Sequence, residues 1–243
     1  MRKSILLISF LVLLKFSSFA QGNWGGGADD QIFSPGFTFQ YLSSEYKIYK
    51  RPDWRKRFFD IETNRFVTDS LQSIKSPTSQ GFGLGFIANF KINDHTDLRI
   101  TPTLVFLART LSYEYHDPTQ NRLVEIPTTT AEFPIGIKLK SDRRLNFRAY
   151  ILAGGKYSHD IVSKKKTTNE GKALTEMLVT NRKGYLSYDV GVGFDFYFEF
   201  FKLTPELKLS NSIGNVLKYE NHPYTSPLEK AYTRNFQFSL FFE

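Results

Sequence analysis

Cysteine is absent from the 243 residues, and long apolar runs are absent after the first twenty. Without cysteine, the chain has neither a disulfide framework nor thiolate chemistry. No later stretch approaches the roughly 20 apolar residues that a membrane-spanning helix requires. Any membrane embedding must therefore use β-strands, whose alternating apolar residues are compatible with a mean hydropathy of −0.32.

Clustered catalytic and metal-ligating residues are also scarce. The histidines lie in four separate connections without metal-ligand spacing, so we expect no metal and no cofactor: His95, His116, His159 and His222. Ser158 beside His159 is the one adjacency that a lipid-modifying enzyme could use, but no acidic partner can be placed, so we do not expect an enzyme.

The N-terminus has the three parts of a signal peptide. Arg2 and Lys3 precede an apolar run from Ile5 to Leu14, and Ser18-Phe19-Ala20 supplies the small-residue cleavage site. We therefore expect residues 1–20 to be removed. The alternative, a membrane anchor, would need a longer run. The formal charge of +8 would fall to +5 on cleavage, which is too mild to indicate nucleic-acid binding.

Apolar residues at every second position mark eight predicted strands. The clearest segment alternates Val190, Val192 and Phe194 with Asp189, Gly191, Gly193 and Asp195. The segments are residues 36–46, 81–92, 97–113, 124–140, 146–157, 185–199, 202–211 and 232–242, approximately. An apolar face opposite a polar face is typical of a transmembrane barrel. We predict an all-β fold, one eight-stranded antiparallel up-and-down barrel of the outer-membrane type over residues 21–243.

The connections between these segments alternate between short and long. The short ones are residues 93–96, 141–146 and 200–201, whereas the long ones are residues 47–80, 115–123, 158–184 and 212–231, approximately. Periplasmic turns and extracellular loops of a barrel have this rhythm. A soluble sandwich with Greek-key crossovers has no reason to keep it. We therefore expect both termini in the periplasm.

Charged residues on the polar face should fill the interior. An eight-stranded barrel leaves a space just wide enough for side chains, so the interior should be a plug and not a channel. Buried charges must be paired, and we expect a structural network across neighbouring strands, with a proton or ion path as the alternative. Its members are Arg99, Arg109, Glu132, Lys138, Arg148, Lys156, Asp189, Asp195, Glu206 and Lys208.

The first long loop begins with a basic stretch interleaved with aromatic residues: Lys50, Arg51, Trp54, Arg55, Lys56 and Arg57. Nucleic-acid sites use such mixtures. On a cell exterior, however, the expected contacts are lipopolysaccharide headgroups or a partner protein. Loops longer than a hairpin requires are commonly functional, so we expect this one to bind.

Four segments resemble the PorT family, outer-membrane barrel components of the type IX secretion system of Bacteroidota. They are Trp24–Asp30, Phe37–Lys47, Phe133–Asp142 and Gly184–Asn211. The resemblance implies a role in exporting cargo with C-terminal sorting domains and, in many members, in gliding motility. It supplies no catalytic residues.

Members of that family have been described as translocating porins, but eight strands cannot pass a folded protein. We therefore expect an accessory subunit that binds other subunits of the secretion system, including the true translocon. An autonomous barrel for adhesion or envelope stress is the alternative.

Overall fold

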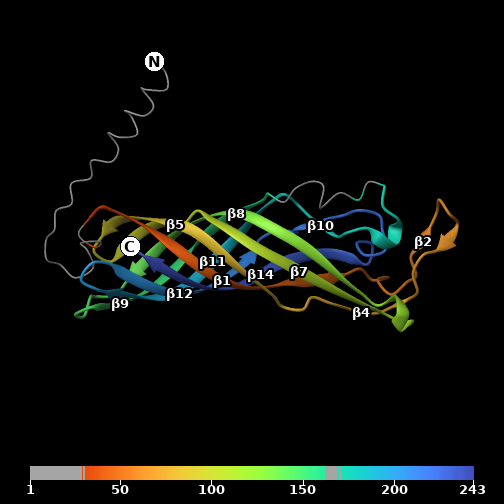
Figure 1. Ribbon diagram of the computed structural model, residues 1–243, viewed down its shortest axis with the longest axis horizontal. Helices are drawn as coiled ribbons and strands as arrows, with labels where there is room; N and C mark the ends of the chain where they lie inside the picture. The colour runs from red at the N-terminus through yellow and green to blue at the C-terminus, as the bar shows by residue number, and fades with distance from the viewer. Residues whose placement is uncertain (1–28, 30, 162–168, 170) are drawn as a thin grey trace, which may run out of the picture.

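An elongated β-barrel makes up most of the molecule (Figure 1). The computed structural model describes residue 29 and residues 31–161, 169 and 171–243, so the expected signal peptide lies outside the described residues. The wall strands are β1 (Phe33–Lys50), β5 (Ser79–Asn93), β6 (Thr96–Ile100), β7 (Thr103–Tyr115), β8 (Arg122–Lys140), β9 (Phe147–Asp160), β11 (Gly184–Tyr197), β12 (Lys202–Ser212) and β14 (Leu228–Phe242). Each of the eight expected segments overlaps a wall strand.

The wall is a closed antiparallel ring. β1 pairs with β5 on one side and with β14, the last strand, on the other, so the ring has no free edge along this seam. β6 and β7 act as one strand, because both pair with β5 and with β8. They are separated at Thr101-Pro102, where proline lacks the N–H that a ladder requires. The eight-stranded antiparallel barrel is thus confirmed.

The two ends of the barrel differ in their connections. Turns of a few residues join β5 to β6, β8 to β9 and β11 to β12 at one end, on the left in Figure 1. We call it the short-turn end; Phe33 and Glu243 lie there. The loop end carries the remaining elements: β2 (Phe59–Asp60), β3 (Arg65–Phe66), β4 (Leu71–Lys75), η1 (Pro118–Gln120), η2 (Leu174–Glu176), β10 (Thr180–Asn181) and β13 (Leu217–Lys218). β4 pairs with β7 and lengthens the wall.

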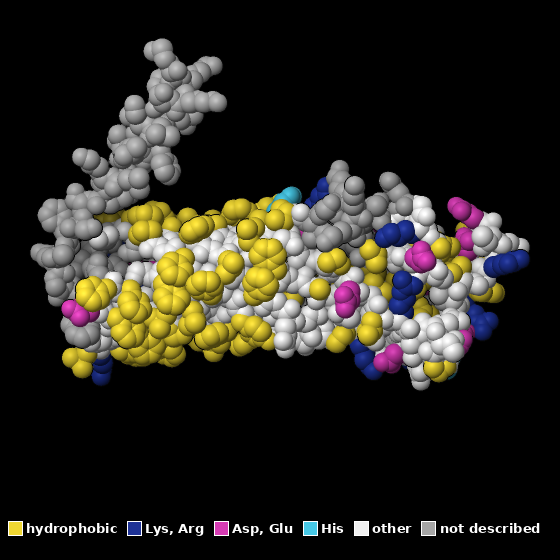
Figure 2. Space-filling view, in the orientation of Figure 1, with side chains coloured by type: hydrophobic (Ala, Val, Ile, Leu, Met, Phe, Trp, Pro, Cys, Tyr) yellow, Lys and Arg dark blue, Asp and Glu magenta, His cyan; other side chains and the backbone are white. Residues whose placement is uncertain are grey.

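Exposed apolar side chains cover the half of the barrel next to the short-turn end on the face seen in Figure 2, and they occur on wall strands all around the ring, so they form a band. The band follows from the period of two, since successive strand residues point to opposite faces. Phe86 is 71% exposed and Ile151 57%, although both are large and apolar. We call this part the banded half and the remainder the loop half. Among the described residues, no helix is long and apolar enough to span a membrane.

The loop half has an apolar interior, which the alternating pattern did not predict. Its buried cluster includes Tyr113, Leu111, Ile126, Val216 and Leu228. The Tyr113 ring packs edge-on against Tyr224 at 5.3 Å between centroids, and its hydroxyl donates to the Tyr224 carbonyl at 2.6 Å. The expectation of a polar plug throughout the interior was therefore wrong for this half. Charged and other polar side chains predominate on its outer face in Figure 2, and its apolar cluster is buried inside, as in an ordinary globular core.

Candidate functional site: the barrel interior and the loop end

Ion pairs fill the interior of the banded half. Lys138 Nζ lies 2.9 and 2.7 Å from the two carboxylate oxygens of Asp195, and neither side chain is exposed. The Thr204 hydroxyl donates to Asp195 Oδ1 at 2.7 Å. Lys138 Nζ also sits 4.0 Å from the centre of the Tyr150 ring. The carboxylate is thus held by several donors, as a buried charge requires.

A second pair crosses the interior. Arg99 Nη1 donates to Glu206 Oε2 at 2.7 Å, and its Nε donates to Asn89 Oδ1 at 2.9 Å. The Tyr150 hydroxyl donates to the same Glu206 oxygen at 2.7 Å. The guanidinium lies 4.8 Å from the centre of the Phe241 ring. Four strands of the wall therefore meet at one hydrogen-bonded group.

The sequence predicts that the interior charges pair across neighbouring strands, and only some of the pairs do so. Lys156 on β9 pairs with Glu132 on β8 at 2.9 Å, and Lys208 on β12 lies 3.7 Å from Asp189 on β11. Lys138 and Asp195, however, are separated by β9, and Arg99 and Glu206 face each other from β6 and β12. That part of the expectation was wrong. The cause is the narrow interior, in which long side chains reach across the barrel.

Gly193 shows how tightly this space is used. A Cβ atom at this position would overlap the phenol of Tyr150, which sits directly opposite it on β9. Glycine is the residue that permits such a close approach. The Tyr150 hydroxyl can therefore reach both Arg99 and Glu206.

Residues near the short-turn end complete the network, and Arg148 is the one among them that the sequence predicted. Arg148 contacts Asp29 at 3.1 Å, Lys202 contacts Glu243 at 2.8 Å and Lys140 contacts Asp97 at 2.6 Å. Tyr197 also donates to Asp29. Lys202 begins β12 and Glu243 directly follows β14, and both continue the inward positions of the alternation, which could have identified them. Asp29 precedes the first strand, where no periodic signal exists.

Arg109 differs from the other nine predicted charges. No carboxylate of the described residues lies within 4.0 Å of it, whereas the other nine are in ion pairs. Its Nε donates to the Ser44 hydroxyl at 2.7 Å and its Nη2 to Asn235 Oδ1 at 3.4 Å. The guanidinium lies 5.6 Å from the Tyr46 ring centre. Arg109 marks the boundary between the charged and the apolar interior.

Little free volume remains beside the interior charges. A cavity next to Arg99, Glu206 and Lys208 measures about 10 Å³, and another next to Asp97 and Lys202 has the same size. Such a volume holds about one water molecule. The interior beside these charges is therefore packed with side chains.

The predicted loop contact lies at the outermost part of the loop end, near β2 in Figure 1. The Trp54 ring carries two cations, with Lys50 Nζ 4.1 Å and the Arg55 guanidinium 4.9 Å from its centre. Arg51 lies 4.7 Å from the centre of the Tyr219 ring, in another loop. Burial, together with repulsion from Arg55 and Lys75, lowers the pKa of Lys50. We call Lys50, Arg51, Trp54, Arg55, Lys56 and Arg57 the basic patch.

A cleft adjoins the basic patch. It has a volume of about 270 Å³ and lies between residues 51–71 and residues 221–227. Arg51, Lys56 and Arg57 line it together with Asp53 and the polar side chains of Asn221 and Ser226. Its lining favours a small polar or anionic group.

The chain matches the model of a known protein family. The model of a family described as outer membrane protein beta-barrel domain matches residues 36–218. The chain belongs to this family. The protein is therefore an outer-membrane β-barrel, and the apolar band is the surface that faces lipid. No curated protein matched the chain.

Several solved structures are similar to this outer-membrane barrel. OprG from Pseudomonas aeruginosa is 11% identical, with 86% of this chain and 93% of that chain covered and a TM-score of 0.45. Ail of Yersinia pestis, solved with the heparin analogue sucrose octasulfate, is 10% identical, with 87% and 99% covered and a TM-score of 0.36. Neisserial surface protein A is 12% identical, with 86% and 97% covered and a TM-score of 0.34.

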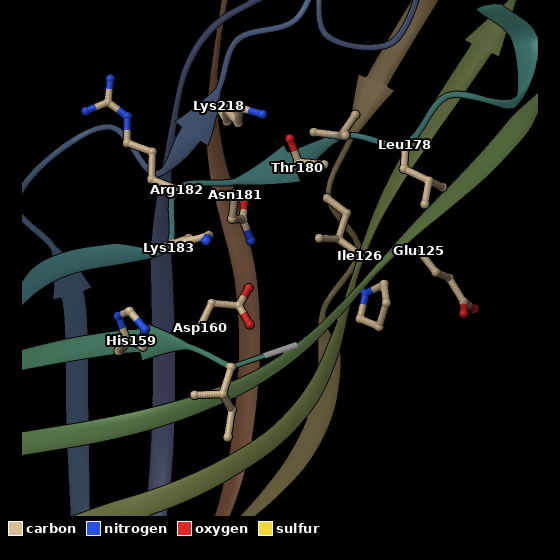
Figure 3. A pocket seen from close by; sticks show the side chains of 13 residues that line it. Glu125, Ile126, His159, Asp160, Leu178, Thr180, Asn181, Arg182, Lys183 and Lys218 are labelled. Atoms are coloured by element: carbon tan, nitrogen blue, oxygen red, sulfur yellow. The ribbon is translucent and has the colours of Figure 1, made fainter. Parts of the chain in front are cut away.

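The side wall of this outer-membrane barrel also holds a pocket of about 620 Å³ in the loop half (Figure 3). Apolar side chains such as Ile126 and Val179 form one part of its lining, and Asp160, Asn181 and Lys183 form another. Cations and carboxylates are both present, so the pocket has no strong preference for one sign of charge.

Ser158 and His159 do not form a catalytic pair in this outer-membrane barrel. Ser158 is buried in the interior, where its hydroxyl donates to Glu132 at 3.4 Å, whereas His159 lies on the outer face beside Tyr157. Adjacent strand residues point to opposite faces, so the two side chains diverge. Among the described residues, no group of three His, Asp or Glu side chains could hold a metal ion.

Proposed function

We propose that this outer-membrane barrel is an accessory subunit of the type IX secretion system, which acts by binding partners and not as an open pore. The observation that carries the second part is the filled interior, with paired charges in the banded half and an apolar core in the loop half. The first part rests on the resemblance of residues 24–30, 37–47, 133–142 and 184–211 to the PorT family. The cargo would carry C-terminal sorting domains, and gliding motility would depend on the same export.

The loop end is the proposed binding end. With the signal peptide removed, the short turns would lie in the periplasm together with both termini, and the loops would lie outside the cell. The apolar band would contact outer-membrane lipid, including lipopolysaccharide. The basic patch would then be available to another secretion subunit, and the translocon is the partner we favour.

Deletion of the gene tests the proposal. We expect sorting-domain cargo to accumulate in the periplasm, and a plasmid copy of the full chain to restore its export. Co-purification in mild detergent followed by mass spectrometry should recover secretion subunits with the protein. Normal cargo export in the deletion strain would overturn the proposed role.

An autonomous adhesion or envelope-stress barrel is the second candidate. The exposed basic patch at the outermost part of the loop end supports it, because such a surface could bind external ligands directly. It predicts normal cargo export and a surface-binding defect in the deletion strain. A lipid-modifying enzyme is disfavoured by the divergent side chains of Ser158 and His159.

A further inference from the structure

The cations of the basic patch are stacked on aromatic rings but lack acidic partners. Lys50 and Arg55 lie over Trp54, and Arg51 lies over Tyr219. No carboxylate of the described residues lies within 4.0 Å of Lys50, Arg51, Arg55 or Lys56, although ion pairs are numerous elsewhere in the chain. A guanidinium on an aromatic face keeps its N–H edge free for a carboxylate and loses little freedom on binding it.

Arg57 shows the completed form of this arrangement. Its guanidinium lies 5.9 Å from the centre of the Phe66 ring, and both Nε and Nη2 lie 2.9 Å from Asp69 Oδ1. The protein therefore already contains one guanidinium that is stacked on a ring and bound to a protein carboxylate. Arg51 and Arg55 have the ring without the carboxylate.

The position of the basic patch limits what can reach it. It lies at the end of the molecule opposite the apolar band, with the polar wall of the loop half between them (Figures 1 and 2). Headgroups of the surrounding membrane are beside the band and not beside this end. We therefore expect the ligand of the basic patch to come from outside the membrane.

The aromatic rings favour one class of such ligands. Sugar rings are bound on open aromatic faces, but Trp54, Tyr219 and Phe66 each already carry a cation. The Phe59 ring, which also lines the cleft, packs edge-on against Phe66. What remains available is a row of N–H donors and the cleft of about 270 Å³ beside Arg51 and Lys56. These donors suit carboxylate side chains of an extended chain.

We infer that the basic patch binds an acidic segment of a partner protein, with carboxylates at Arg51 and Arg55 placed as Asp69 is placed at Arg57. This inference rests on the proposed function, because the proposed function supplies a partner at the loop end. It adds the chemical class of the partner segment that binds there. Lys50 and Lys56 add positive charge to the same surface. The interaction weakens as salt is added, because exposed charges are screened.

The test uses the protein purified from outer membranes in a zwitterionic detergent, with a fluorescent peptide of eight glutamates as the probe. The patch variant is Arg51→Gln, Arg55→Gln and Lys56→Gln. The matched control removes the same charge from other exposed sites of the loop end: Arg182→Gln, Lys183→Gln and Lys230→Gln. Fluorescence anisotropy gives the dissociation constants, and a heat-dependent shift on a denaturing gel shows that each variant is folded.

We expect the patch variant to bind the peptide at least about tenfold more weakly than the unaltered protein, and the control to change less than about threefold. Arg51→Lys with Arg55→Lys keeps the charge but loses the planar N–H edge, so we expect it to weaken binding as well. Equal losses in the patch variant and the control would mean that only net charge matters, which would overturn the inference.

Three further outcomes test the class of ligand and distinguish failure of this inference from failure of the proposed function. A sulfated polysaccharide that displaces the peptide at a lower concentration than unlabelled octaglutamate would overturn the choice of a protein ligand. Loss of cargo export on gene deletion, together with full export by the folded patch variant, would overturn the inference and leave the proposed function intact. Normal export on deletion, with selective peptide binding, would overturn the function alone.

Discussion

The banded half and the loop half use the same strands with opposite polarity. Along β8, Lys138 and Glu132 point into a charged interior, while Phe133 and Ile135 face outward. Further along the strand, Ile126 points inward to the apolar cluster. The reversal occurs within one continuous strand, so strand geometry alone does not set which face is apolar.

This difference shows that the environment outside the wall determines which face of each strand is apolar. In the banded half the outside is lipid, so polar groups are placed inside and must satisfy one another. In the loop half the outside is water, so the apolar groups are placed inside, as in a soluble core. Arg109 on β7 lies opposite Ile126 on β8 in the strand register. At this level of the barrel the charged interior ends and the apolar interior begins.

The largest effect should come from breaking a charge pair in the banded half. Asp195→Leu would leave Lys138 without its carboxylate in a fully buried site. We expect a loss of about 3 to 5 kcal/mol in the free energy of unfolding, because a buried charge would be uncompensated. Urea titration of the barrel in lipid vesicles, followed by its gel mobility without boiling, measures it.

The double variant Asp195→Leu with Lys138→Met is the control. It removes both charges, and replacing a buried ion pair by apolar residues is often close to neutral. Stability should therefore recover in large part. A double variant as unstable as the single one would show that the pair is not the source of the effect.

The next largest effect should come from placing an arginine on the outer face, and its size should differ between the two halves. Val190 is 53% exposed in the apolar band and Leu123 is 66% exposed on the loop half. Val190→Arg should cost about 2 to 4 kcal/mol because it places a charge in lipid, whereas Leu123→Arg should cost about 0 to 1 kcal/mol. The same urea titration compares them. Equal costs at both positions would contradict the difference in surroundings between the two halves.

The sequence predicted the banded half well and the loop half poorly, for physical reasons. Alternation such as Val190, Val192 and Phe194 against Asp189 is a local pattern that one face in lipid enforces over each strand. The apolar core instead joins residues from distant loops, such as Leu71, Val216 and Tyr224, which have no common period. Pairs across the interior, such as Arg99 with Glu206, depend on the ring closing and could not be assigned from spacing.

The third prediction is that acid lowers the stability of the loop half and not that of the banded half. His222 is buried, and burial lowers its pKa from 6.5 to about 4. The neutral ring is held in place, because Nδ1 accepts from the Tyr224 amide at 3.3 Å and Nε2 lies 2.6 Å from the Thr225 hydroxyl.

The unfolded loop takes up a proton below about pH 6.5 while the folded loop does not, so its stability is complete above that pH and falls toward pH 4. At pH 5 the loss should be about 2 kcal/mol. Hydrogen exchange of residues 219–227 at pH 7.5 and 5.0, corrected for the intrinsic exchange rate, measures it. His222→Gln should remove the pH dependence, and unchanged protection at pH 5 in the unaltered protein would contradict it.

The smallest effect should occur at the level where the two halves meet. Arg109 has hydrogen bonds to Ser44 and Asn235 but no carboxylate of the described residues within 4.0 Å. Arg109→Met removes a buried charge whose cost of desolvation is not offset by an ion pair, and it adds an apolar side chain beside Tyr46 and the apolar core. We expect stability to change by no more than about 1 kcal/mol in either direction. A loss comparable to that of Asp195→Leu would mean that an anion accompanies Arg109 in the folded barrel, and the charged interior would then extend one level further toward the loop end.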